Sequence, residues 1–262
     1  MSTKLDQILE TTRRGLPALR ERLPELERLA RDRPSAPSLT AALSRSTVAL
    51  IAEVKRRSPS AGEISTDLDP VSHAREYAES GAAAISVLTD GPFFGGSLDD
   101  LRAVSTTVAV PTIRKDFILD EAQVLEARIA GASAVLLIVR ALSPGRLQEL
   151  RIFSESQGLE ALVETHDARE LDIALEAGAR IIGVNSRNLD DFHIDVPAAW
   201  KLLARVPRNR IAVAESGMAT LDDVRAAAQS GADAVLIGTA LSSASRPGDL
   251  VSAFADVQRR PR

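Results

Sequence analysis

Short runs of apolar residues recur along the chain from residue 49 onward, separated by stretches in which polar and apolar residues follow the period of a helix. The stretches Asp69–Ser80, Glu121–Ala130 and Leu221–Ser230 are three examples. Eight apolar runs are predicted strands: Ala49–Val54, Ala83–Leu88, Val108–Ile113, Ala134–Val139, Ala161–Val163, Ile181–Val184, Ile211–Ala214 and Ala234–Ile237. Continuous apolar strands that alternate with helices predict a parallel sheet covered on both faces.

A tripeptide with a central glycine closes four of the predicted helices just before the next strand. Glycine suits this place because the residue after a helix commonly adopts a left-handed conformation. The tripeptides recur about every 50 residues, which is the length of two strand–helix units: Ser80-Gly81-Ala82, Ala130-Gly131-Ala132, Ala177-Gly178-Ala179 and Ser230-Gly231-Ala232. Eight such units predict an α/β fold of the (β/α)₈ barrel type. The alternative is an open doubly wound sheet, whose glycine-rich fingerprint after the first strand is absent here.

Residues 1–46 are helical in character and are predicted to form an N-terminal extension, with residues 47–262 forming the barrel. Apolar stripes precede and follow Gly15 and Pro17, so we expect the helix to be interrupted there. Pro24 is expected to begin or kink a further turn, and Leu39–Leu43 is expected to be one more short helix. The apolar stripes could cover the barrel or meet a second copy, and we favour a monomer.

Composition excludes several classes of function. The net charge of −4 and an aromatic content of 3% argue against nucleic-acid binding. The chain lacks cysteine, a secretory signal and an apolar run long enough to span a bilayer, so we expect a cytoplasmic protein without membrane association. Its histidines, His73, His166 and His193, lack metal-ligand spacing, so no metal is expected. His166 follows Glu164 near a strand end, but we expect it at the surface.

Charged and polar residues cluster at the C-terminal ends of the predicted strands. Glu53 and Lys55 are two positions apart, so both side chains point to the same face of the first strand. Lys115, Glu164, Asn185, Arg187 and Glu215 follow or end later strands in the same way. A solvated scatter of charges would not favour one end of nearly every strand, whereas a barrel of this type carries its catalytic groups there.

The last two strands are followed by Ser216-Gly217 and Gly238-Thr239, which predict a phosphate site. Glycine lets backbone N–H groups approach an anion, and barrels of this type often bind phosphate at this place. The alternative is two routine strand–helix turns.

A lysine held near carboxylates stays protonated and can act as a general acid, and a glutamate in a partly apolar mouth can act as a base. Part of the charged set must also be structural, because buried charges need partners. Phe94 and Phe117 follow the second and third strands, where they predict either an apolar wall for a flat ring or ordinary packing.

These residues resemble the motifs of the indole-3-glycerol phosphate synthase family. The resemblance runs in order from about Leu39 to the last predicted helix. Its motifs are Ile51-Ala52-Glu53-Val54-Lys55 with Ser58-Pro59-Ser60, Val87-Leu88-Thr89-Asp90 with Phe93-Phe94-Gly95-Gly96-Ser97-Leu98, Arg114-Lys115-Asp116-Phe117-Ile118, Leu162-Val163-Glu164, Gly183-Val184-Asn185-Ser186-Arg187-Asn188-Leu189 and Ala214-Glu215-Ser216-Gly217. Gly95 departs from the pattern, since many relatives carry a polar residue there.

The resemblance implies a (β/α)₈ barrel with a helical extension over the active-site end. It also implies ring closure, decarboxylation and dehydration of 1-(2-carboxyphenylamino)-1-deoxyribulose 5-phosphate to indole-3-glycerol phosphate in tryptophan biosynthesis, without a cofactor. Two alternatives are a phosphosugar isomerase or aldolase on the same barrel, and a non-catalytic barrel that serves as a binding scaffold. An aldolase that forms a Schiff base would need a lysine of lowered pKa.

The roles that the resemblance implies fall into three groups. Lys115 is the general acid, Glu164 the base and Lys55 a candidate second acid, held by Glu53, while Glu215 and Asn185 position the polar centre of the substrate. Ser216, Gly217, Gly238 and Thr239 hold the phosphate. Phe94, Phe117 and Leu189 wall the aromatic ring, with Arg187 and Ser58 near its carboxylate.

Overall fold

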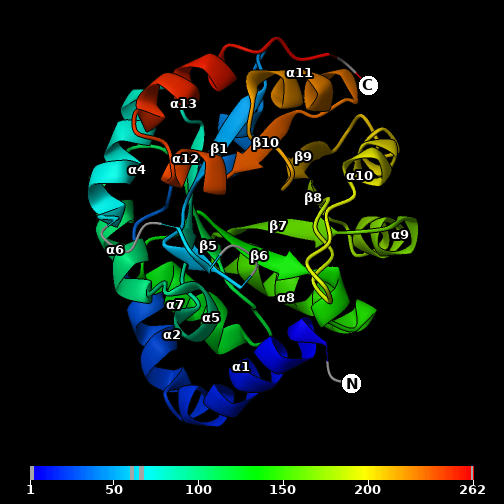
Figure 1. Ribbon diagram of the computed structural model, residues 1–262. Coiled ribbons are helices and arrows are strands. Elements are labelled where there is room, and N and C mark those ends of the chain that lie inside the picture. The colour runs from blue at the N-terminus through cyan, green and yellow to red at the C-terminus, as the bar shows by residue number, and fades with distance from the viewer. Residues whose placement is uncertain (1–2, 60–61, 65–67, 261) are drawn as a thin grey trace.

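Eight parallel strands close into a barrel, as the computed structural model of the chain shows for residues 3–59, 62–64, 68–260 and 262 (Figure 1). Each strand pairs with the next barrel strand along the chain, and the last pairs with the first. The strands are β1 (Ala49–Val54), β4 (Ala84–Leu88), β5 (Thr112–Lys115), β6 (Ala134–Ile138), β7 (Glu160–Thr165), β8 (Ile181–Asn185), β9 (Ile211–Glu215) and β10 (Ala234–Ile237). The predicted barrel is confirmed, and the open sheet is ruled out because no edge remains between β1 and β10.

Helices lie between successive strands and form the outer layer of the barrel (Figure 1). They are α4 (Pro70–Glu79), α6 (Leu98–Thr107), α7 (Glu121–Ile129), α8 (Pro144–Ser156), α9 (Ala168–Glu176), α10 (Val196–Leu203), α11 (Leu221–Gln229) and α13 (Pro247–Ala255). Shorter elements come directly after four of the strands, at their C-terminal ends. They are the pair β2 (Arg57–Ser58) and β3 (Gly62–Glu63), α5 (Gly91–Phe94), the 3₁₀ helix η1 (Val139–Ala141) and α12 (Thr239–Ser242). None of the helices in the described part of the chain is both long and apolar enough to cross a membrane.

The repeated glycines end their helices as the sequence predicts. Gly81, Gly131, Gly178 and Gly231 have φ angles of 108°, 87°, 81° and 96°, in the left-handed region that favours glycine. Each lets the chain leave its helix and enter the next strand within a few residues.

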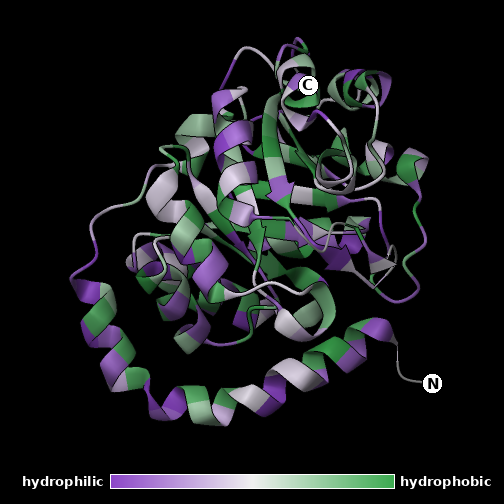
Figure 2. Ribbon diagram, turned by 60° about the vertical axis from the view of Figure 1, so that its left-hand side comes forward, coloured by the Kyte–Doolittle hydropathy of each residue, from purple (hydrophilic) through white to green (hydrophobic). Residues whose placement is uncertain are grey.

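Two apolar layers account for the buried faces of each strand. Side chains such as Ile51, Ile113 and Leu162 point into the barrel, while Leu50, Val135 and Val163 point outward against the helices. Figure 2 shows hydrophobic residues concentrated on the strands and on the helix faces that meet them. Burial on both faces explains why the strands read as continuous apolar runs.

The predicted third strand is displaced along the sequence. The apolar run Val108–Ile113 was expected to form it, but β5 begins at Thr112. Pro111 has no backbone N–H and therefore cannot donate to a sheet ladder, so residues 108–111 form the connection. The displacement makes Arg114 and Lys115 part of the strand, and their side chains consequently point to opposite faces of it.

The helical extension contains α1 (Lys4–Glu21), α2 (Leu23–Arg31) and α3 (Leu39–Leu43). The expected interruption at Gly15 and Pro17 is wrong, because α1 continues through both residues. Proline removes one helical hydrogen bond. The helix continues because Leu16 and the apolar residues of the preceding turns are buried against the barrel, which offsets this loss. Pro24 lies in the first turn of α2, as expected.

The extension contacts both ends of the barrel. Leu5, Ile8, Leu9 and Leu16 of α1 belong to the same apolar cluster as Phe117 and Leu119, which follow β5 at the C-terminal end of the strands. Leu39 and Leu43 of α3 are fully buried against the first residues of several strands, at the opposite end. Glu160, which begins β7, accepts hydrogen bonds from the Leu39 and Thr40 backbone N–H groups and so anchors α3 there.

We predict that Leu43→Ala destabilises the protein by about 2–5 kcal/mol, because it leaves a cavity beneath the barrel interior. Ile152→Ala is the matched control, since Ile152 is 50% exposed. The two free energies of unfolding can be compared by urea denaturation. Equal losses for both variants would contradict the assignment of α3 as part of the core.

Candidate active site

All fifteen residues that the sequence predicted for the site line one cavity of about 360 Å³ at the C-terminal ends of the strands. They are Glu53, Lys55, Ser58, Phe94, Lys115, Phe117, Glu164, Asn185, Arg187, Leu189, Glu215, Ser216, Gly217, Gly238 and Thr239. They come from seven of the eight strand–helix units, so residues far apart in the sequence converge. Ser60, part of the same sequence motif as Ser58, lies outside the described residues.

Lys115, the last residue of β5, lies at the centre of the charged cluster. Its Nζ is 3.1 Å from Glu164 Oε2 at the end of β7 and 3.4 Å from Glu215 Oε2 at the end of β9. Burial by itself lowers the pKa of Lys115, but the nearby carboxylates of Glu164, Glu215 and Glu53 outweigh it and raise that pKa above its usual range. Lys115 is therefore a cation with a proton to donate.

The two carboxylates that share Lys115 differ in charge. Burial raises the pKa of both, but Lys115 and His166 outweigh it at Glu164 and hold the pKa of that carboxyl well below its usual range. At Glu215, burial and the neighbouring Glu164 prevail over Lys115 and raise the pKa to about 8. A single lysine does not neutralise two adjacent buried carboxylates, so one of them keeps its proton at neutral pH.

Gly183 makes room for this arrangement. A Cβ atom at Gly183 would lie 2.1 Å from Glu215 Oε1, a distance that no side chain tolerates. Gly183 is not among the predicted site residues, although it stands in the motif that leads to Asn185. The signal was a glycine inside a run that otherwise reads as a buried strand, which often marks a close approach.

Glu53 and Lys55 form a second ion pair at the end of β1. Lys55 Nζ lies 2.8 Å from Glu53 Oε1, and both side chains are largely buried. A Cβ atom at Gly238 would lie 2.4 Å from the same Glu53 oxygen. Gly238 therefore gives space to the Glu53 carboxylate, a role beyond the phosphate contact predicted for it.

An apolar wall lies on one side of the cavity. The rings of Phe94 and Phe117 lie 6.2 Å apart between centroids and are tilted by 39°. Leu189, Phe192 and Ile194 extend the apolar lining from the loop after β8. Phe192 and Ile194 were not predicted, because their loop has no periodic pattern. Phe192 also has a φ of 61°, an uncommon value outside glycine that often occurs at functional sites.

The backbone after β9 turns in the left-handed region at two successive residues, Ser216 with φ of 64° and Gly217 with φ of 71°. A Cβ atom at Gly217 would lie 2.5 Å from Val196 Cγ2 and 2.9 Å from Ser186 Oγ, so only glycine fits the turn. Gly238 and Thr239, at the start of α12, lie against the same part of the cavity. Concave turns of this kind can bind anions through backbone N–H groups.

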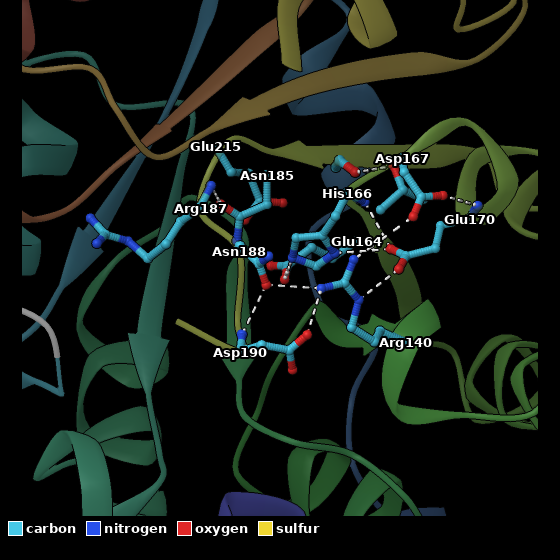
Figure 3. A network of polar contacts seen from close by, with 12 residues as sticks. Arg140, Glu164, His166, Asp167, Glu170, Asn185, Arg187, Asn188, Asp190 and Glu215 are labelled. Carbon is cyan, nitrogen blue, oxygen red and sulfur yellow. Dashed lines mark hydrogen bonds and ion pairs between the residues drawn. The ribbon is translucent and has the colours of Figure 1, made fainter. Parts of the chain in front are cut away.

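Arg187 and Ser58 also lie on the cavity wall. Arg187 Nη1 donates to the Phe192 carbonyl oxygen over 3.3 Å, and its backbone N–H donates to Asn185 Oδ1 over 3.0 Å. Burial lowers the pKa of Arg187, an effect that Glu53 opposes. The guanidinium extends away from the Glu164–Arg140 network, as Figure 3 shows.

Two further charged residues near the site, His166 and Arg114, lie outside the cavity lining. The surface position expected for His166 is wrong: its side chain is 5% exposed and contacts Glu164. Arg114 points to the outer face of the barrel, where it donates to Asp116 Oδ2 over 3.0 Å and to the Gln123 carbonyl oxygen over 2.6 Å. Arg114 is thus a structural group, as alternation along β5 requires.

No group of three or more His, Asp or Glu side chains in the described ranges is arranged to hold a metal ion. The chemistry that the arrangement supports is acid–base chemistry. It offers two lysine–carboxylate pairs, one ionised glutamate and one neutral glutamate in a space with an apolar side.

Comparisons with known proteins identify relatives over nearly the whole chain. The sequence model of the family described as indole-3-glycerol phosphate synthase matches residues 5–253. An indole-3-glycerol phosphate synthase from Chlorobium chlorochromatii is 47% identical over 244 residues, covering 91% of this chain and 95% of that protein. Indole-3-glycerol phosphate synthase 2 from Streptomyces coelicolor is 48% identical and covers 87% of this chain and 88% of its own length.

Solved structures confirm the fold at much lower identity. The crystal structure of 2-keto-3-deoxy-6-phospho-gluconate aldolase from Zymomonas mobilis superposes with a TM-score of 0.62 at 13% identity, covering 86% of this chain and 100% of that one. Such a likeness shows the barrel alone. The extent of the family match and the identity to its members, together with the site described above, show that this chain belongs to the indole-3-glycerol phosphate synthase family.

Proposed function

We propose that this protein converts 1-(2-carboxyphenylamino)-1-deoxyribulose 5-phosphate into indole-3-glycerol phosphate, CO₂ and water, the ring-closing step of tryptophan biosynthesis. The observation that carries the proposal is the position of Lys115 Nζ between Glu164 and Glu215, at the centre of a cavity with an apolar wall. This reaction needs a charged proton donor and a base within reach of the same few substrate atoms.

Ring closure begins when the ring carbon that bears the carboxylate attacks the C2′ carbonyl carbon. The carbonyl oxygen then takes a proton, which Lys115 supplies. CO₂ leaves, and the electron pair of the broken bond restores the aromatic ring. Lys115 suits this step because its carboxylate neighbours keep it charged before the attack.

Dehydration completes the indole. The C2′ hydroxyl leaves as water with a proton from an acid, and a base removes a proton from C1′. Glu164, whose pKa is held low, is ionised and can accept that proton. Lys55 is the candidate acid, and its ion pair with Glu53 at 2.8 Å holds it in place. Asn185 and the neutral carboxyl of Glu215 hold the substrate hydroxyl groups between them.

The two ends of the substrate fit the two sides of the cavity. The turns after β9 and β10 would bind the phosphate through Ser216, Gly217, Gly238 and Thr239. The Phe94–Phe117 wall, which follows β4 and β5 across the barrel, would bind the aromatic ring with Leu189. Arg187 and Ser58, on the wall between these sites, would contact the ring carboxylate.

A Schiff-base aldolase on the same barrel is disfavoured. That chemistry needs a lysine of lowered pKa, whereas the pKa of Lys115 is raised by its carboxylates. The presence of both lysines and all three glutamates in one cavity also disfavours a non-catalytic scaffold.

We further propose a cytoplasmic monomer in which residues 47–262 form the catalytic barrel and residues 1–46 a packed extension. The apolar faces of α1 and α2 support a monomer, because they pack on this chain's own barrel. Leu26 and Ala30 of α2, for example, are buried against Ala122 and Leu125 of α7. The net charge of −4 supports the expectation that nucleic acid is not a partner.

We expect Lys115→Ala to reduce kcat by about 10²- to 10⁴-fold, the range typical of a general acid. Formation of indole fluorescence from the carboxyphenylamino substrate measures the rate, and circular dichroism checks the fold. Lys201→Ala is the matched control, since Lys201 is exposed on α10. A Lys115→Ala protein with the wild-type rate would remove Lys115 from the mechanism.

We expect turnover without added metal, because the chemistry can be performed by lysine and glutamate side chains alone. Dialysis against EDTA followed by the fluorescence assay measures this. A rate that EDTA abolishes and a divalent cation restores would contradict the proposed mechanism.

The pH profile should report Glu215. Its carboxyl is neutral below its raised pKa of about 8 and loses its proton above it, so kcat should fall as the pH rises through this value. Glu215→Gln keeps a neutral side chain of the same shape, so its alkaline fall near that pH should disappear. An unchanged alkaline limb in Glu215→Gln would assign the limb to another group.

A further inference from the structure

His166 lies directly behind the proposed base. It follows the end of β7, its side chain is 5% exposed, and its Nε2 lies 3.4 Å from Glu164 Oε1. Glu164 Oε1 and His166 Nε2 are both buried, and neither forms a hydrogen bond among the described residues, so each is the nearest charged partner available to the other. The other carboxylate oxygen, Oε2, accepts from Lys115 Nζ over 3.1 Å. Glu164 thus lies between two cations, one on each oxygen.

The imidazole ring is held from the opposite side by α9. Glu170 Oε2 lies 2.9 Å from His166 Nδ1 and accepts from the His166 backbone N–H over 2.8 Å. Arg140 Nε donates to the other Glu170 oxygen over 2.8 Å. Figure 3 shows Arg140 between Glu170 and the loop after β8, where its Nη1 donates to Asn188 Oδ1 over 3.0 Å. The ring is therefore held in one orientation by groups outside the substrate cavity.

A carboxylate on each ring nitrogen favours the charged imidazolium. Burial lowers the pKa of His166, but the carboxylates of Glu164 and Glu170 outweigh burial and raise the pKa to about 9. His166 is therefore charged at neutral pH, and it is not among the residues that line the cavity.

The proposed mechanism creates a need for such a cation. Once Lys115 has given its proton to the substrate oxygen, it no longer offsets the cost of burying the charge on Glu164. Burial would then raise the pKa of Glu164, and a protonated Glu164 could not act as the base in dehydration. Glu215 adds no compensation, because it can only be neutral or negative.

We propose that His166 is a positioning residue for Glu164, a lasting counter-charge that keeps this carboxylate ionised and oriented while Lys115 is without its proton. The inference rests on the proposed function, because it assumes that Lys115 donates a proton and Glu164 accepts one.

The charged groups around His166 and Glu164 come from several elements of the barrel, and every one of these groups contributes to the pH dependence of the two residues. Glu164 and Glu170 contact His166 directly, and the next groups outward are Lys115 on β5, Glu215 on β9, Glu53 on β1, Arg140 on η1, Asp167 after β7 and Asp190 after β8. Lys115 and His166 both contact Glu164. Lys115 loses its charge when it donates its proton, whereas His166 keeps its charge throughout the reaction.

The first test is the pH dependence of kcat in His166→Gln, which keeps a hydrogen-bond donor but loses the charge. We expect kcat to fall by about ten- to a hundredfold with KM nearly unchanged, because the base is weakened but present. We also expect the acid limb of kcat to move up by about one pH unit or more, as loss of a nearby opposite charge requires. His73→Gln on α4, outside the cavity, is the matched control. An acid limb that stays at its wild-type pH would overturn the proposal, whatever the change in kcat.

The second test needs no turnover. Lys115→Met reproduces the state in which Lys115 carries no charge, and the ¹³C carboxyl resonance of Glu164, assigned with Glu164→Gln, reports its ionisation. We expect Glu164 to be ionised at pH 7 in Lys115→Met and protonated in the Lys115→Met/His166→Gln double variant. An ionised Glu164 in both variants, or a protonated one in both, would overturn the proposal.

The two tests separate this inference from the proposed function. If the wild-type protein failed to form indole-3-glycerol phosphate, the function would fall, while the ionisation of Glu164 would still decide the role of His166. If the double variant does not fold, as judged by near-UV circular dichroism, the pH profile of the single His166→Gln variant decides it.

Discussion

The arrangement of the site depends on one constraint: buried charges at the C-terminal rim of the barrel must neutralise one another. Lys115 is shared by Glu164 and Glu215, and this sharing gives the three groups three different charges at neutral pH: positive, negative and neutral. An isolated charge at this depth would neutralise itself by a shift of pKa. A donor, an acceptor and a neutral carboxyl therefore arise from one lysine and two glutamates because they are buried together.

The barrel supplies the geometry that this cluster needs. Parallel strands end at the same rim, and alternation along each strand points the last residues inward, which is why Lys115 enters the cavity while its neighbour Arg114 joins an outer ion pair. Glycine then determines how closely the carboxylates approach. Gly183 admits the Glu215 side chain and Gly238 admits Glu53, at positions where any Cβ atom would collide with a carboxylate oxygen.

Sequence reasoning succeeded where a residue type serves one physical purpose. Continuous apolar runs predicted the strands, the repeated glycines predicted the helix ends, and polar residues at strand ends predicted the site lining. It failed where two local effects compete. At Pro17 the loss of a helical hydrogen bond was overcome by burial of α1 on the barrel, and at β5 the apolar residues 108–111 proved to be a connection because Pro111 cannot donate to a ladder.

The sequence by itself determined the fold class, the family and fifteen of the residues that line the cavity, because each depends on local periodicity or on short motifs. The tertiary structure alone decided which charges pair and which protonation states follow. His166 illustrates the difference: in the sequence it is an isolated histidine, but in the fold Glu170 from the next helix and Glu164 from its own strand enclose it as a cation. Such a role depends on distances between side chains and on their removal from water, and no linear pattern encodes either of them.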